Sequence, residues 1–167
     1  MEEREKSEIV WEERTIEDMG IAIQMPEKFF EFNNDFKEIM YPYGNMPKYV
    51  FGGEDIQFQM MFNITPNKIA NHQIKEFLPI AKKVMTQAGP KVHVVQSGII
   101  TKEEHQVAVI EFVSRAVDMS VYNMMFYYSL EEQLMMGSVN FPFKDKEKMI
   151  PVAKDILESL RFLKEVQ

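Results

Sequence analysis

Two neighbouring stretches of the sequence, residues 106–117 and 119–130, are apolar on both faces of an extended chain. The first alternates one set of apolar side chains with another: Ala108, Ile110 and Phe112 against Val107, Val109 and Val113. Successive side chains of a strand point to opposite sides, so a strand of this kind has to be covered on both sides. The pattern therefore predicts a sheet inside the molecule with a covering layer on each face.

Short polar connections turn this region into a meander of four strands, at residues 91–101, 106–117, 119–130 and 133–143. The last connection is Glu131-Glu132, and a two-residue loop there pairs Leu130 with Gln133. This register predicts three further pairs on one face of the sheet: Tyr128 with Met135, Met124 with Val139, and Tyr122 with Phe141. Cross-strand pairs of this kind stabilise a sheet by about 0.2–1 kcal/mol each.

The rest of the first half predicts more strands and one helix. Strands are expected at residues 8–15, 20–25, 48–51 and 55–64. The helix is expected to begin with Thr65 as its N-cap and Pro66 in its first turn, and to end at Gly89. Pro79 lies inside it and is expected to kink the helix or to start a second segment, because proline donates no backbone hydrogen bond.

The C-terminal part is expected to form a second helix over residues 146–162, with Pro151 in or near its first turn. Residues 27–46 give no clear pattern beyond a short helix or strand near residues 36–41. Together the elements predict an α+β fold, a three-layer α/β/α sandwich with a central, mostly antiparallel sheet of about six or seven strands. Residues 1–167 are expected to form a single domain with a frayed end at residues 1–6.

Composition narrows the classes of function. The chain has no cysteine, which excludes disulfides, thiolate metal sites and cysteine nucleophiles. Its formal net charge is -7 and no basic cluster interrupts it, so no nucleic acid is expected as a partner. No apolar run reaches the roughly 18 residues of a membrane span, and no signal peptide is visible. The chain as written is expected to be cytoplasmic; a secreted protein or lipoprotein is the alternative if a leader has been removed.

The sequence contains no pattern typical of a catalytic or metal site. The three histidines, His72, His93 and His105, lack the close spacing of metal ligands, so no metal and no cofactor are expected. Neither a nucleophile elbow nor a Gly-rich phosphate loop is present. Glu111 interrupts an apolar strand face, where an ion pair with Arg115 is expected in preference to acid catalysis. The sequence predicts a protein that is not an enzyme.

Three short motifs occur in a recognisable order. Residues 20–27, Gly-Ile-Ala-Ile-Gln-Met-Pro-Glu, read as a strand closed by proline and an acidic residue. Thr65-Pro66 follows the strand after the turn at Phe51, and residues 156–162, Ile-Leu-Glu-Ser-Leu-Arg-Phe, end the last helix. The arrangement resembles bacterial members of the superfamily that contains PsbP, the DcrB-like proteins and a Ran-binding nuclear import factor. The resemblance implies an α/β/α sandwich that usually binds other proteins, and no functional residue carries over.

Two groups of residues are candidates for binding a partner. One lies in the aromatic stretch, at Phe30, Phe36, Tyr41 and Tyr43, and the other on the predicted sheet face, at Tyr122, Met124 and Tyr128. The 14 methionines fit either a biased genome or an adaptable contact surface.

The first functional hypothesis is a non-catalytic adaptor or chaperone-like module whose partner is an unidentified protein or peptide, and a homodimer is left open. The alternative is a carrier of a small apolar ligand, with a pocket between the sheet and the kinked helix. An exposed patch favours the first hypothesis, and a cavity of about 300 Å³ or more favours the second.

Overall fold

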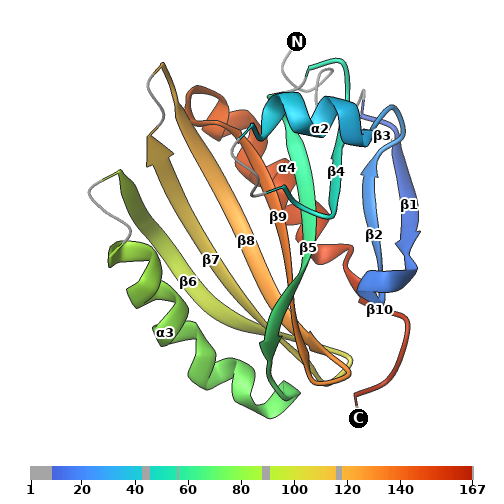
Figure 1. Cartoon of the computed structure of the whole chain (residues 1–167), viewed down its shortest axis with the longest axis vertical. Helices are drawn as coiled ribbons and strands as arrows, with labels where there is room; N and C mark the ends of the chain where they lie inside the picture. Colours follow the sequence, from blue (N-terminus) through green and yellow to red (C-terminus); the bar gives the residue numbers. More distant parts are fainter. Residues whose placement is uncertain (1–8, 43–45, 56, 88–90, 116–117, 167) are drawn as a thin grey trace.

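A seven-stranded antiparallel sheet runs through the middle of the molecule (Figure 1). The computed structural model describes residues 9–42, 46–55, 57–87, 91–115 and 118–166. In spatial order the strands are β3 (Phe30–Glu31), β4 (Tyr49–Gly52), β5 (Gln59–Lys68), β9 (Gln133–Pro142), β8 (Ser120–Leu130), β7 (His105–Arg115) and β6 (Val92–Lys102). All neighbouring strands in this order are antiparallel.

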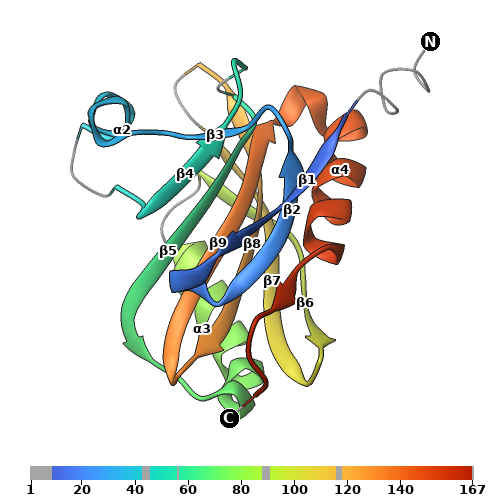
Figure 2. The ribbon, with the colours of Figure 1, turned by 90° about the vertical axis from the view of Figure 1, so that its right-hand side faces the viewer.

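The two faces of this sheet are covered by different layers (Figure 2). One face carries α3 (Ile74–Gln87), which packs mainly on β6 and β7. The other face carries α4 (Lys146–Glu158) together with a three-stranded sheet. That small sheet has the order β1 (Trp11–Ile16), β2 (Ile21–Pro26), β10 (Arg161–Phe162). The predicted α+β sandwich around an antiparallel sheet is confirmed, and one of its outer layers combines a helix with a sheet.

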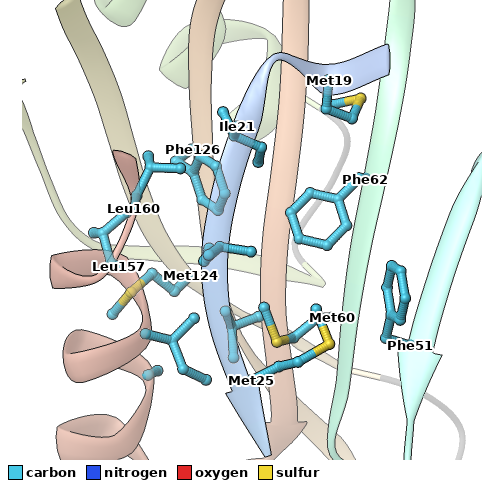
Figure 3. Packing of buried hydrophobic residues seen from close by; sticks show 14 of the residues in the cluster. Met19, Ile21, Met25, Phe51, Met60, Phe62, Met124, Phe126, Leu157 and Leu160 are labelled. Carbon is cyan, nitrogen blue, oxygen red and sulfur yellow. The ribbon is translucent and has the colours of Figure 1, made fainter. Parts of the chain in front are cut away.

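The main core lies between the large sheet and the layer formed by α4 and the small sheet (Figure 3). Phe62 and Phe126 meet there edge to face, with ring centroids 6.4 Å apart. Five of the 14 methionines belong to this core: Met19, Met25, Met60, Met124 and Met135. At these positions the flexible thioethers fill irregular space inside the protein.

A smaller core lies between α3 and the opposite face of the large sheet. Ile74, Ala108 and Leu134 are buried in it, and Phe77 packs edge-on against Tyr127 with ring centroids 5.1 Å apart. Both faces of the middle strands are therefore shielded, as their two-sided apolar pattern predicts.

The hairpin between β8 and β9 has the register predicted from its two-residue loop. Leu130 pairs with Gln133, and the three predicted pairs follow: Tyr128 with Met135, Met124 with Val139, and Tyr122 with Phe141. The loop residues Glu131 and Glu132 have positive φ angles of 49° and 65°. The β6–β7 hairpin turns in the same way, through Glu103 and Glu104 at 49° and 70°. Two consecutive loop residues in the left-handed backbone conformation match the right-handed twist of the flanking strands.

The expected start of the first helix is wrong. Thr65 and Pro66 belong to β5, which begins at Gln59, later than predicted, and runs to Lys68. The Thr65 hydroxyl donates to the carbonyl of Leu134 at 2.9 Å, and the Gln133 amide donates to the carbonyl of Thr65 at 2.6 Å. Neighbouring β9 thus supplies partners that outweigh the local capping signal. Pro66 is tolerated because the register between β5 and β9 shifts at this point.

Helix α3 instead follows a short 3-10 turn, η2 (Asn71–Gln73), whose entry is fixed by the Gln73 side chain accepting the Ala70 N–H at 2.9 Å. Pro79 lies inside α3, which continues through it as one helix. The expected end at Gly89 lies outside the described residues.

The second helix also differs from its prediction. It starts at Lys146 after a 3-10 turn, η3 (Phe143–Asp145), with Pro151 in its interior, and it ends at Glu158. Arg161 and Phe162 leave the helix and pair with Ala22 and Ile21 of β2. The terminal motif therefore begins in the helix, as predicted, but its end, Arg161-Phe162, forms a strand, because its partner lies at the other end of the sequence.

Candidate functional site

Helix α2 (Asn34–Met40) stands out from the β3–β4 edge of the large sheet (Figure 2). Asn33 caps its N-terminus, since the side-chain oxygen accepts the Phe36 N–H at 2.8 Å. Near residues 36–41, where the sequence left a short helix or a strand open, the structure has this helix. Its position brings the first group of candidate binding residues together.

A buried ring, Phe32, anchors α2 to the sheet edge. Phe30 and Phe36 pack on it with ring centroids 5.3 and 4.8 Å away. Gly52 leaves the necessary room, because a Cβ there would lie 2.7 Å from the Phe32 ring. Phe30 itself is 50% exposed, and Phe36 is half-buried. Two of the predicted binding residues therefore flank one buried aromatic anchor.

The apolar area continues along the helix. Ile39 is 76% exposed, the highest value among the exposed large apolar residues of the described chain. It follows Phe36 by three positions, so the two side chains are neighbours on the helix. We call the area formed by Phe30, Phe36, Ile39 and Met40 the α2 surface. Ile39 was missed in the sequence because the helical period of this segment was hidden among aromatic and turn residues.

Lys37 fixes the opposite side of α2. It is only 5% exposed, and its ammonium donates to the carbonyls of Pro47 at 3.4 Å and Lys48 at 2.9 Å. The Tyr41 hydroxyl meets the Met61 sulfur at 2.8 Å, and burial raises the pKa of this phenol. Both contacts tie α2 to the body of the protein. Tyr41 is half-buried, and Tyr43 lies outside the described residues.

The second group of candidate residues does not form an open groove. Tyr122, Met124 and Tyr128 are 3%, 1% and 0% exposed, because α4 and the small sheet cover this face completely. The Tyr128 hydroxyl donates to the carbonyl of Met19 at 2.6 Å, and burial raises its pKa. No pattern in the sequence indicated that β1, β2 and β10 form the covering layer. These three residues are core residues in this structure.

Glu111 has a structural role of a different kind from the expected ion pair. It is 5% exposed, and one carboxylate oxygen accepts the Tyr122 hydroxyl at 2.7 Å. Its other oxygen accepts from the Gln96 amide. Burial and the neighbouring carboxylate raise the pKa of Tyr122. Uncharged donors therefore satisfy Glu111 where a pair with Arg115 was expected.

The elements that line a pocket of about 420 Å³ meet at the lower end of the molecule in Figure 1, away from α2. The β8–β9 loop, the η2 turn and the C-terminal segment around Lys164 line it. His105, one of the lining residues, stacks on Phe162 with ring centroids 3.8 Å apart. The sequence predicts a pocket between the sheet and the kinked helix; this pocket lies instead beside the η2 turn that precedes α3, and no residue of α3 lines it. Its lining is mixed polar and apolar.

In the described part of the chain, no three acidic or histidine side chains are grouped so as to hold a metal ion. Within the same residues, no helix has the length and hydrophobicity needed to cross a membrane.

Comparison with solved structures adds the fold relationship. The solution structure of cyanobacterial PsbP from Synechocystis sp. PCC 6803 superimposes with a TM-score of 0.62, covering 91% of this chain and 92% of that one at 8% sequence identity. The chain has the PsbP-like fold. The expectation drawn from the three motifs is thereby confirmed for the fold, although Thr65-Pro66 and the end of the terminal motif lie in other elements than expected.

A second PsbP-like neighbour is LpqN of Mycobacterium tuberculosis, a protein involved in cell envelope biogenesis. Its TM-score is 0.56, with 93% of this chain and 92% of LpqN covered at 9% identity. No protein-family model and no curated protein sequence matches the chain. At these identities the likeness concerns the PsbP-like fold alone.

Proposed function

We propose that the protein is a non-catalytic binding module that captures a protein partner on the α2 surface. The observation that carries this proposal is the exposure of Phe30 and Ile39, which the half-buried Phe36 and the buried Phe32 support from below. Exposed apolar residues gathered on a well-anchored part of the surface are typical of protein-binding sites. Aromatic anchors that are already held in place lose little side-chain entropy on binding.

The charges around the α2 surface indicate the chemistry of the partner. Glu31, Asp35 and Glu38 are exposed beside this surface, whereas Lys37 of the same helix is buried. An apolar centre with an acidic rim is complementary to a partner that has an apolar patch bordered by basic side chains. Such a rim accelerates association and makes it sensitive to salt, while the apolar centre supplies most of the affinity.

The absence of catalysis is part of the same proposal. The buried carboxylate of Glu111 is occupied by Tyr122 and Gln96, and the His105 ring is held by Phe162 and the Lys164 carbonyl. The titratable groups that are buried therefore have structural partners. This supports a binding role, in line with the absence of catalytic patterns in the sequence.

Site-specific photo-crosslinking tests the α2 surface. A photoreactive residue replaces Ile39 in one variant and Ile80 in another; Ile80 is a matched control, because it is 61% exposed on the solvent side of α3. Both are incubated with cytoplasmic and envelope fractions of the source cells. We expect one protein to be trapped at position 39 and not at position 80. Equal trapping at both positions would contradict the proposal.

Affinity measurements with the trapped partner complete the test. The double substitution Phe30→Ser with Ile39→Ser should weaken binding by about tenfold or more, as loss of central apolar contacts does. The control pair Ile80→Ser with Val84→Ser should leave the affinity unchanged. Both pairs are surface changes, so the free energy of unfolding should move by no more than about 0.5 kcal/mol per site. Binding that survives the first pair would refute the α2 surface.

The second candidate function is a small-molecule carrier, and the 420 Å³ pocket is the observation that favours it. The volume lies in the range of about 300–1,000 Å³ found for small-molecule sites. The mixed lining fits an amphiphilic ligand better than the purely apolar one expected from the sequence.

A further inference from the structure

The pocket at the end of the sheet has one wall made by the C-terminal segment. The Leu163 N–H donates to the carbonyl of Gly20 at 3.0 Å, and the His105 Nε2 lies 2.8 Å from the carbonyl of Lys164. Since a carbonyl only accepts, His105 is the donor in that contact. Gly20 has a φ of +67°, and a Cβ there would lie 2.7 Å from the Leu130 side chain. The wall is therefore held by specific contacts at several points.

The charges that line the pocket do not balance. Lys164, its lysine, is paired with Glu131 at 3.0 Å. Glu132 and Glu165 also line the pocket, and neither has an ion-pair partner among the residues that the structure describes. The lining therefore holds two carboxylates that no lysine or arginine compensates. An anionic ligand would be repelled, and a cation would be attracted.

The uncharged polar groups of the pocket give the same indication. The Ser129 hydroxyl donates its proton to the carbonyl of Ile69 at 2.7 Å, so it can only accept from a ligand. The Asn71 side chain is used on both sides, donating to the Glu104 carbonyl at 3.2 Å and accepting the Gln106 N–H at 2.8 Å. Besides the exposed His72, whose ring offers both a donor and an acceptor, the side-chain groups that remain for a ligand are acceptors, and a ligand that donates hydrogen bonds suits them.

The rest of the lining is apolar. Leu130, Phe162 and Ala70 contribute hydrocarbon surface between the acceptor groups. A ligand with a small apolar body and one donor head satisfies both parts of the lining.

We propose that this pocket binds a small organic cation, a primary ammonium carried on an apolar body. The ammonium donates to the carboxylates of Glu132 and Glu165 and to the Ser129 hydroxyl, and the apolar body lies against Leu130 and Phe162. The proposal rests on the second candidate function, the small-molecule carrier, and it is independent of the α2 surface.

Three probes of one shape test it by calorimetry and by two-dimensional amide NMR: 3-phenylpropylamine, 3-phenyl-1-propanol and 3-phenylpropionate. We expect the ammonium to bind with a Kd below about 1 mM, and the alcohol and the carboxylate to bind at least tenfold more weakly. Its chemical-shift changes should centre on Ser129, Leu130 and Lys164. Preference for the alcohol or the carboxylate would overturn the cation proposal while leaving the carrier function. Failure of all three probes would reject both.

A pair of variants tests the two carboxylates directly. Glu132→Gln with Glu165→Gln should weaken ammonium binding by about tenfold or more, because both charge-assisted hydrogen bonds are lost. Glu54→Gln with Glu147→Gln removes the same charge from exposed positions elsewhere and should leave the affinity within about twofold, since distant surface charges are screened. All four positions are exposed, so folding is retained. Equal effects of the two pairs would refute the assignment of the ammonium to Glu132 and Glu165.

Discussion

Gly137 lies directly under the ring of Phe126, and the substitution Gly137→Ala tests the packing of the main core. The two residues face each other across β8 and β9, and Phe62 of β5 faces Gly137 from the other side. A Cβ at position 137 would lie 2.2 Å from Cζ of Phe126. Real Cβ atoms do not come so close, so the ring would have to move. Phe126 is 1% exposed and also packs against Phe62 and Tyr128, which leaves it little room.

The expected magnitude is the difference of two effects. Overfilling a packed core costs about 1–3 kcal/mol. Replacing a strand glycine by alanine raises the free energy of unfolding by about 0.5–1 kcal/mol, because the unfolded chain loses conformational freedom. Taking the middle of each range, the net destabilisation should be about 1 kcal/mol. For a domain of this size the midpoint of thermal unfolding should then fall by about 2–4 °C.

Gly98→Ala is the matched control. Gly98 also lies in a strand, β6, but no atom outside its immediate neighbours lies within 4 Å of a Cβ placed there. This substitution should be neutral or stabilising by up to about 1 kcal/mol. Urea unfolding followed by circular dichroism gives both free energies. In a Phe126→Leu background the cost of Gly137→Ala should shrink, because the smaller side chain frees the space. If the two glycine substitutions have the same effect, Phe126 does not cover Gly137.

Two further predictions concern α3 and its neighbour Tyr127. Pro79 lies midway along α3 with its side chain exposed, and it leaves the Lys75 carbonyl without its helical donor. Pro79→Ala should therefore stabilise the protein by about 1–2 kcal/mol. An unchanged or lower melting temperature would show that the helix does not pass regularly through this position. Burial raises the pKa of Tyr127 to about 12, so its contribution to stability is complete below the unfolded pKa near 10 and is lost as pH rises towards 12. Between pH 8 and pH 11, the free energy of unfolding of Tyr127→Phe, measured in urea, should therefore fall by about 1 kcal/mol less than that of the parent protein. Identical decreases would contradict the burial of this phenol.

The sequence predicted best where local rules determine the structure. The two-residue loop at Glu131-Glu132 fixes the register between β8 and β9, and the predicted pairs of Tyr122, Met124 and Tyr128 all follow from the length of that loop. The two-sided apolar pattern of residues 106–130 likewise required two covering layers. These inferences needed no knowledge of distant contacts.

The errors arose where distant contacts outweigh local signals. Thr65-Pro66 has the local chemistry of a helix start, yet β9 lies beside it and provides hydrogen-bond partners for a strand. Residues 161 and 162 directly follow the apolar helical stripe that ends at Leu160, yet β2 pairs with them. Tyr122, Met124 and Tyr128 were expected to be accessible, because nothing in the sequence placed the small sheet over them. Tertiary context decides such segments.

The strand β2 is the only one of the small sheet that touches both others, and its two neighbours come from opposite ends of the sequence. During synthesis the β1–β2 hairpin is therefore exposed on one edge until Arg161 and Phe162 have left the ribosome. Until then Tyr128 lacks the contact with Phe162, and the nascent chain exposes an apolar surface of the kind that chaperones recognise. Arg161 and Phe162 thus complete the cover over this part of the interior.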